Sequence, residues 1–477
     1  MLLGFVILYL VFSIGIGVYA ATRVKSSRDY VVAGRSLPIY IVTATVFATW
    51  FGSETVLGIS ATFLQDGLGG IVSDPFGSSL CLILVGLFFA RPLYRMNLLT
   101  IGDYYRNKYG RPVEIIVSLA IVISYMGWVS AQMTALGLVF NVLSDGTVTQ
   151  MQGTLIGAAI VLLYTLFGGM WSVALTDFFQ MTIIVLGMLF IGWEVSSLAG
   201  GVGTVVSHAQ ASGKLEFWPA VNARDIVAFA AAWLTMMLGS IPQQDVFQRV
   251  MSAKNENTAV HGSILGGSLY FVFAFIPVFI AYSATLIDPG MVDRLLQTDT
   301  QMILPTLVLD HMPIFAQVMF FGALLSAIMS TASGTLLAPS VTFTENILKG
   351  FMHRMNDRHL LWLMRGVVVC FAVLVTVFAL YSDATIYEMV ENAYKVTLVV
   401  AFTPLAFGVY WKRANTQGAM LAIIFGLLTW IPLEIWNPEG FWPPQFAGLL
   451  MSILGMIVGS LMPKVWLAHR HAGHAEK

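Results

Sequence analysis

The sequence predicts an all-α membrane protein that crosses the bilayer many times. Of its 477 residues, 57% are hydrophobic and only 10% are charged, whereas soluble domains carry about 25% charged residues. Apolar runs of about 20 residues, the length at which a helix spans a bilayer, follow one another along the whole chain with short polar gaps. We therefore expect residues 1–477 to form a single transmembrane domain surrounded by lipid.

About thirteen apolar runs are long enough to be transmembrane helices. The first run has no basic segment before it and no small-residue cleavage site, so we interpret it as a span and not as a signal peptide. The expected spans are residues 2–22, 38–64, 71–94, 113–143, 152–172, 178–199, 224–241, 263–286, 313–341, 360–381, 386–411, 417–435 and 446–463.

The basic residues fall mainly in alternate connections between these spans. An odd number of spans places the two termini on opposite sides, and the side richer in lysine and arginine is the cytoplasmic one. This rule puts the N-terminus outside and the C-terminus inside, with Arg249 among the cytoplasmic loop residues and the aspartate-rich loop 287–312 outside. We expect the protein in a cell membrane, and specifically in a bacterial inner membrane.

Two spans carry residues that interrupt helices. The second span contains Gly52-Ser53, and the seventh contains the stretch Gly239–Gln244 with Pro242. Glycine lowers the cost of unwinding, and proline removes a hydrogen-bond donor. The two spans are five apart and so cross the bilayer in opposite directions. Paired broken helices of this kind are typical of the binding sites of transporters; a pair of ordinary kinks is the alternative.

The ninth span carries hydroxyls on one helix face. Ser326, Ser330 and Ser333 follow spacings of four and three, and Thr331 lies beside them. Such side chains often bond back to their own helix or join helices together. A whole cluster of uncharged oxygens also suits Na⁺, because weak ligation lets the ion leave again.

Several segments of the chain resemble the sodium:solute symporter family, which includes glucose, proline, sialic acid and choline carriers. They are "GRSLP" at 34–38, "YTLFGGMWSVALTDFFQ" at 164–180, "FQRVMSAKN" at 247–255 and "SAIMSTASG" at 326–334. The choline-carrier branch is similar in "ATW" at 48–50, "GLFFARP" at 86–92 and "GSIPQQDVFQRV" at 239–250. The resemblance implies a five-plus-five inverted-repeat core with discontinuous helices 2 and 7. Its halves are residues 38–199 and 224–411, and residues 1–22 and 417–463 are additional helices.

The resemblance also implies a sodium site where the second span meets the ninth, with Na⁺ as the coupled ion. Its ligands would be the backbone carbonyls of Ala48, Phe51 and Ala327 and the hydroxyls of Ser330 and Thr331.

A second sodium site of the family would correspond to Asp177, Ser330 and Ser333. Gly334 stands where the family has a further serine ligand, which puts the second ion in doubt. Asp177 could instead cap the N-terminus of the sixth span, because carboxylates are favourable there.

The expected substrate pocket lies between the two breaks. By resemblance, Trp50 and Trp128 match two tryptophans of an aromatic cage for a quaternary ammonium, which such rings attract through their negative faces. The third expected tryptophan is Gln243, followed by Gln244, and this departure argues against choline itself.

Glu54 and Asp74 add carboxylates to this pocket, and a buried anion is costly unless something pairs with it. Spans 2 and 4 contain no lysine or arginine, and span 7, as bounded above, contains only Arg224 at its first residue. An amine substrate would supply the charge. Glu54 could instead carry a proton, bond the unwound backbone or match the sugar-contacting glutamate of sugar carriers. Asp74 could lie in an outer vestibule without touching substrate.

Lys395 is the one basic residue well inside a span. Glu391 lies four residues earlier, an order that favours an ion pair along a helix. We expect this pair at the outer gate, and a hold on a substrate carboxylate by Lys395 is the alternative.

These features predict a Na⁺-driven symporter that imports a small organic solute, best a cationic or zwitterionic amine. A sugar or carboxylate is the alternative solute, and a channel or a membrane sensor with a transporter fold is the alternative class. The sequence contains no His or Cys cluster and no phosphate-binding loop, so we expect no enzymatic activity and no nucleic-acid partner. We expect a monomer or a weak oligomer.

Overall fold

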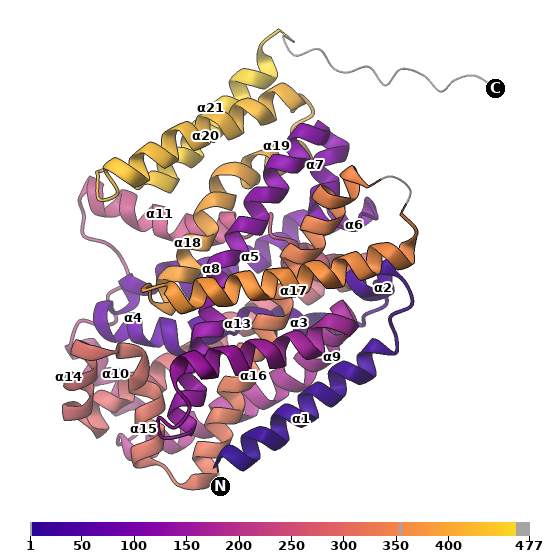
Figure 1. Ribbon diagram of the computed structural model, residues 1–477. Helices are drawn as coiled ribbons and strands as arrows, with labels where there is room; N and C mark the ends of the chain where they lie inside the picture. Colours follow the sequence, from indigo (N-terminus) through magenta and orange to yellow (C-terminus); the bar gives the residue numbers. More distant parts are fainter. Residues whose placement is uncertain (1, 353–354, 464–477) are drawn as a thin grey trace.

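The computed structural model describes residues 2–352 and 355–463, and the regular secondary structure of this part is helical (Figure 1), apart from an isolated bridge between Leu37 and Ala253. Short 3₁₀ and π turns join some of the helices. The elements of the first half are α1 (Leu2–Ala21), α2 (Ser27–Val32), α3 (Ile39–Trp50), η2 (Glu54–Gly58), α4 (Ile59–Asp66), α5 (Ser78–Leu84), α6 (Ala90–Arg95), α7 (Ile101–Tyr109), α8 (Arg111–Leu143) and α9 (Gln150–Leu198). Those of the second half are α10 (Val202–Ala211), α11 (Ala223–Gly239), α12 (Gln244–Ser252), α13 (Glu256–Ile287), α14 (Pro289–Thr298), α15 (Ile303–His311), α16 (Ile314–Thr342), η7 (Phe343–Ile347), α17 (Asp357–Tyr381), α18 (Ile386–Thr397), α19 (Thr403–Tyr410), α20 (Thr416–Trp436) and α21 (Pro444–Leu461).

Ten helices of the described part are long and apolar enough to cross a membrane, or eleven if the bent pair α11–α12 is one span. Three features separate this number from the thirteen expected spans. The helix α3 is only 12 residues long because it ends at the first break. The helices α11 and α12 are bent by 45° at the second break. Two expected spans, 152–172 and 178–199, lie together in α9. The chain is thus a multi-pass helical protein, and the number thirteen stays a prediction.

The long helix α9 breaks inside and not at the expected loop. Its 49 residues would make a straight helix of about 74 Å, more than twice the roughly 30 Å of a bilayer core. The break is at Gly169, whose φ of 50° and ψ of −137° are not helical. Glycine is needed there because a Cβ would collide with Tyr30. The segment 173–177, expected to connect two spans, is therefore helical.

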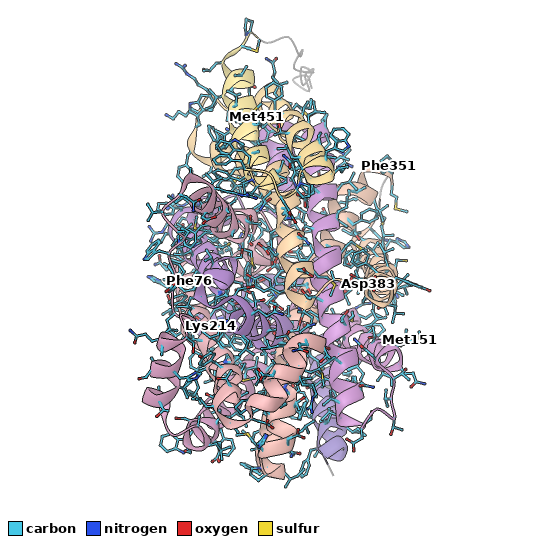
Figure 2. The ribbon with its side chains drawn as sticks, turned by 90° about the vertical axis from the view of Figure 1, so that its left-hand side faces the viewer. Phe76, Met151, Lys214, Phe351, Asp383 and Met451 are labelled. Carbon is cyan, nitrogen blue, oxygen red and sulfur yellow. The ribbon has the colours of Figure 1, made fainter. Side chains whose placement is uncertain are left out.

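The long helices pack side by side across the molecule. The helix α9 contacts α1, α8 and α16, and α3 packs against α9, α13 and α16. In Figure 1, the short helices α10, α14 and α15 gather at the lower left, whereas α2 and α6 lie at the right. The helices α20 and α21 pack on each other at one end of the molecule, where Met451 of α21 is seen in Figure 2. The helices α3 and α12 contact each other and both contact α13 and α16, so the two breaks lie among packed helices, where a protected site can form.

A buried polar knot ties the end of α16 to α7 and α8. The Asn346 Nδ2, in η7, donates to Asp103 Oδ1 and to Glu114 Oε1, both at 3.0 Å. The Arg111 Nη1 donates to Glu114 Oε2 at 2.8 Å and to the Asn346 carbonyl at 2.7 Å. The Glu114 carboxylate is fully buried, and these donors stabilise it. The knot lies at the end of the helices that we predict to face the cytoplasm.

Candidate functional site at the two helix breaks

The first break confirms the interruption that Gly52-Ser53 predicts. The helix α3 ends at Trp50, Phe51 has a non-helical φ of −88° and ψ of 72°, and η2 begins at Glu54. Gly52 allows a close approach between this turn and α16, because a Cβ there would come within 3.0 Å of both the Glu54 Oε2 and the Thr331 Oγ1. Glu54 belongs to the expected substrate pocket and Thr331 to the expected sodium site. Their side-chain oxygens therefore both lie next to the Cα of Gly52.

The Glu54 carboxylate is buried and receives two side-chain N–H groups. Trp128 Nε1 donates to its Oε1 at 3.0 Å, and Gln132 Nε2 donates to its Oε2 at 2.7 Å. The Gln132 Oε1 in turn accepts from the backbone N of Ser53 at 3.0 Å, so Gln132 connects Glu54 to the unwound backbone. Among the described residues, no lysine or arginine forms an ion pair with Glu54. Its charge is thus hydrogen-bonded but not matched by a cation.

Four aromatic side chains from three helices meet beside Glu54, and we call Trp50, Tyr125, Trp128 and Tyr394 the aromatic cluster. The rings of Trp50 and Trp128 lie edge to face with centroids 5.4 Å apart. Tyr394 of α18 stacks on Trp50 at 6.1 Å and lies 5.6 Å from Trp128, and Tyr125 stacks on Trp128 at 6.0 Å. All four are buried. The two tryptophans expected together are therefore in contact, and the buried Tyr394 Oη has no hydrogen-bond partner in the described structure.

The second break brings a further carboxylate to the same cluster. Asp245 lies in the first turn of α12 and is fully buried. Trp50 Nε1 donates to its Oδ2 at 3.2 Å, and the Tyr125 hydroxyl donates to its Oδ1. Glu54 and Asp245 therefore each accept the indole N–H of one tryptophan of the contacting pair. The analysis of the sequence missed Asp245, because the seventh span was expected to end at residue 241.

Arg249 corrects two expectations that followed from the same boundary. It is not a cytoplasmic loop residue but is only 1% exposed inside α12, and the broken seventh helix therefore does contain a basic side chain. Its Nη1 donates to the carbonyl of Asp245 at 2.9 Å, and its Nη2 donates to Thr49 Oγ1 at 2.5 Å. The spacing of four between Asp245 and Arg249 in "QDVFQRV" was the signal that could have revealed this pair on one helix face.

The two glutamines of the second break lie outside the aromatic cluster. Gln243 Nε2 donates to Ser124 Oγ at 2.9 Å and to Thr397 Oγ1 at 3.3 Å, and these partners lie one helical turn from residues of the cluster. The Gln244 Oε1 accepts from the backbone N of Ile101 at 2.8 Å, at the start of α7. In this conformation Gln243 is a neighbour of the cluster, whereas Gln244 is turned toward another helix.

Asp74 is connected to the first break through a tyrosine. It is buried, and its Oδ1 accepts from the Tyr270 hydroxyl at 2.5 Å and from the Ser78 hydroxyl. The Tyr270 Oη lies 3.1 Å from Thr55 Oγ1, next to Glu54 in the chain. Asp74 is therefore not exposed in an outer vestibule in this conformation, and its printed partners are protein hydroxyls.

The expected sodium ligands lie where α3 ends against α16. All five, Ala48, Phe51, Ala327, Ser330 and Thr331, are buried. The Thr331 hydroxyl has no hydrogen-bond partner in the described structure and is close to the Cα of Gly52. A buried unpaired hydroxyl is costly, so an oxygen free at this place fits a site for a small cation.

Asp177 forms a second polar cluster next to these ligands. Its Oδ1 accepts from Ser330 Oγ at 2.7 Å, and its Oδ2 accepts from Thr49 Oγ1 at 3.2 Å and from the hydroxyl of Thr45. The alternative of a helix cap is wrong, because Asp177 lies inside the continuous helix that follows Gly169 and bonds three side chains of other helices. The third expected ligand, Ser333, donates to the carbonyl of Ser330 at 3.0 Å and not to Asp177.

The expected pair of Lys395 with Glu391 is replaced by another pair. Lys395 Nζ donates to Glu434 Oε1 of α20 at 3.0 Å, and this is its ion pair. The Glu391 Oε1 accepts from Ser73 Oγ at 3.1 Å instead. Lys395 therefore joins α18 to the additional helix α20, which local spacing along one helix did not reveal.

Comparisons with known proteins agree with this architecture. The sequence profile of the sodium:solute symporter family matches residues 30–426. The high affinity choline transporter 1 of Homo sapiens is 29% identical over 465 residues, covering 93% of this chain and 79% of that protein. The osmoregulated proline transporter OpuE of Bacillus subtilis is 25% identical, covering 96% and 94%.

Solved structures show the same fold. The structure of a Na⁺-coupled sialic acid symporter in a substrate-bound outward-open state has a TM-score of 0.82 at 18% identity, covering 96% of both chains. The transporter Mhp1 of the nucleobase-cation-symport-1 family has a TM-score of 0.60 at 16% identity, covering 90% of this chain and 94% of Mhp1. Because the family profile covers most of the chain and both broken helices, the chain belongs to the sodium:solute symporter family.

Proposed function

We propose that this protein imports a small organic cation that carries at least one N–H group, together with Na⁺, by alternating access. The observation that carries the proposal is the aromatic cluster between two buried carboxylates. Glu54 and Asp245 each accept a hydrogen bond from one tryptophan N–H. Neither carboxylate forms an ion pair among the described residues. A solute with positive charge would supply what this site lacks.

The aromatic cluster favours a cation over a neutral sugar or an anion. Tryptophan and tyrosine faces attract an organic cation, and the attraction grows when the site is shielded from water. A solute carboxylate without an amine would instead be repelled by Glu54 and Asp245. The human choline transporter that the chain resembles carries, by its name, a cationic solute, which supports the same charge class here.

The two carboxylates favour an amine with N–H groups over a quaternary ammonium. A carboxylate accepts hydrogen bonds and has no donor of its own, so it gains from an ammonium N–H and not from an N-methyl group. A hydrogen bond to a charged group contributes about 1.5–3 kcal/mol, which is about ten- to a hundredfold in affinity. Gln243, at the position of a further cage tryptophan in the resembling branch, also lies beside the cluster and not in it.

The proposed coupling to Na⁺ depends on Gly52. The Glu54 Oε2 and the Thr331 Oγ1 both lie within 3.0 Å of the place where a Gly52 Cβ would be. A Na⁺ held by Thr331 and the carbonyls of the broken helix would therefore lie near the carboxylate that faces the solute. Binding of the ion fixes the unwound turn, and the fixed turn presents Glu54 and Trp50 to the solute.

A graded series of amines tests the proposal. Thermal unfolding of the purified protein is measured with ethanolamine, its N-methyl and N,N-dimethyl derivatives and choline, in Na⁺ and in K⁺. We expect the three protonated amines to stabilise the protein in Na⁺ far more than in K⁺. The affinity should drop about tenfold or more from the dimethyl derivative to choline, because only choline lacks an N–H.

Two variants define the role of Glu54 in this series. Glu54→Gln should remove most of the difference between the dimethyl derivative and choline, and it should change Na⁺ binding less than amine binding. Glu439→Gln, the same change at an exposed residue, should leave the series unchanged. Stabilisation by a sugar or a carboxylate and by none of the amines would contradict the proposal. Equal affinities for choline and its dimethyl analogue would contradict the N–H requirement and leave a cation as the solute.

A further inference from the structure

A buried guanidinium fills the space in front of Gly334 on α16. A Cβ on Gly334 would come within 3.0 Å of the Arg249 Nη2, which is too close for van der Waals contact. The same Nη2 donates to Thr49 Oγ1 at 2.5 Å, and the Nη1 is held by the carbonyl of Asp245. Any side chain at Gly334, including the serine that a second sodium site would need, therefore requires Arg249 to move.

The hydroxyl of Thr49 connects the Arg249 guanidinium to the Asp177 carboxylate. Thr49 Oγ1 accepts from Arg249 Nη2 and donates to Asp177 Oδ2 at 3.2 Å. All three side chains are buried. Asp177 forms no ion pair among the described residues, so Arg249 is the charge that reaches it through this relay. Two buried positive charges beside a single carboxylate would repel each other strongly in a medium of low dielectric constant.

The hydroxyls around Asp177 also leave few oxygens for an ion. Those of Ser330, Thr49 and Thr45 already donate to the carboxylate. The hydroxyl of Ser333 is directed to the carbonyl of Ser330. Thr331 differs, since its hydroxyl is buried without a partner.

We infer that Arg249 is the fixed counter-cation of the Asp177 cluster and takes the place of a second sodium ion. The protein then binds one Na⁺ per transport cycle, at the site of Thr331 and the carbonyls of the first break. Arg249 determines the ion stoichiometry without touching the solute. This inference rests on the proposed Na⁺ coupling and adds the number of ions and the residue that sets it.

Equilibrium binding of ²²Na⁺ to the purified protein tests the inference directly. We expect one specifically bound ion per wild-type chain. Thr331→Ala should weaken this binding at least tenfold, because it removes a ligand of the only site. Arg249→Gln combined with Gly334→Ser removes the guanidinium and adds a hydroxyl, so this double variant should bind two ions. Arg249→Lys keeps the positive charge and should still bind one.

Each result separates the inference from the proposed function. Two ions bound to the wild type, or one ion bound to Thr331→Ala with unchanged affinity, would overturn the role of Arg249. A double variant that is folded, as shown by its thermal unfolding, and still binds one ion would overturn it as well. If the double variant does not fold, the wild type and Thr331→Ala decide the question. A wild type that binds no Na⁺ would overturn the proposed coupling together with the inference.

Discussion

The breaks at Gly52 and at Pro242 both interrupt a helix beside the aromatic cluster, but they differ in which charged and polar side chains lack a partner. The second break begins the short helix α12, which carries both Asp245 and Arg249 and so contains charges of both signs. The first break carries Glu54 and lies against the unpartnered hydroxyl of Thr331, with no basic side chain in an ion pair with Glu54 among the described residues. The second break therefore has a basic side chain on its own helix, whereas the first has none in an ion pair and is where an arriving cation would be needed most. We expect ligand-dependent changes of conformation to begin at the first break.

Gly52→Ala should have the largest effect, because it acts on ion and solute together. Its Cβ would collide with both the Glu54 Oε2 and the Thr331 Oγ1, and overpacking of this kind costs about 1–3 kcal/mol. We expect uptake of amine into proteoliposomes to fall by about a hundredfold. Gly322→Ala in the same helix as Thr331 is the matched control, since nothing lies within 4 Å of its Cβ. Uptake by Gly52→Ala within a few fold of the wild type would show that the two sites are not joined at this residue.

Phenylalanine at the two tryptophans compares the carboxylates directly. Trp128→Phe and Trp50→Phe each keep an aromatic ring and remove one N–H, from Glu54 and from Asp245 respectively. A lost hydrogen bond to a charged group costs about 1.5–3 kcal/mol. We expect Trp128→Phe to reduce amine affinity about tenfold. Each carboxylate keeps one other side-chain donor, Gln132 on Glu54 and Tyr125 on Asp245. Trp50→Phe should have a smaller effect, because Arg249 lies on the same helix as Asp245. Competition against a labelled amine measures both, and the reverse order would contradict the difference between the breaks.

Lys395→Met should have the smallest effect. Lys395 pairs with Glu434 of α20, and the two side chains are 18% and 34% exposed, so the pair contributes at most about 1 kcal/mol. We expect a slightly lower melting temperature and an unchanged amine affinity. A large loss of affinity would assign Lys395 to the solute and would place a basic group near the first break after all.

The sequence predicted the breaks well because their causes are local. Gly52 and Pro242 interrupt helices through their own backbone chemistry, whatever surrounds them. The resemblance to a known branch assigned Trp50 and Trp128 to one pocket. The structure places the two rings in contact, and their role in binding stays a prediction. The predicted seventh span left out α12, because Gln243 and Gln244 end its apolar pattern, whereas buried helix begins again at Gln244 after the break.

The missed features depend on partners that are far apart in the sequence. From the sequence alone, Arg249 was expected in a cytoplasmic loop. Its hydrogen-bond partner Thr49 is 200 positions away in the chain, so local patterns do not reveal the contact. The partner of Lys395 is on a helix outside the expected repeats, and the cluster around Asp177 draws hydroxyls from α3 and α16. Spacing within a single helix describes neighbours along that helix and gives no measure of such contacts.

The knot around Asn346 has a kinetic consequence. If the side with this knot opens to release solute, Asn346 must separate from Asp103 and Glu114, and the buried carboxylate of Glu114 is then left with arginine as its donor. None of these residues is among the expected ligands of Na⁺ or solute. We expect the cost of this separation to lower the turnover rate, whereas we expect the residues at the breaks to determine the affinity for ligand. Turnover and affinity can then change independently, because Asn346 lies beyond the C-terminal end of α16 whereas Thr331 lies inside that helix.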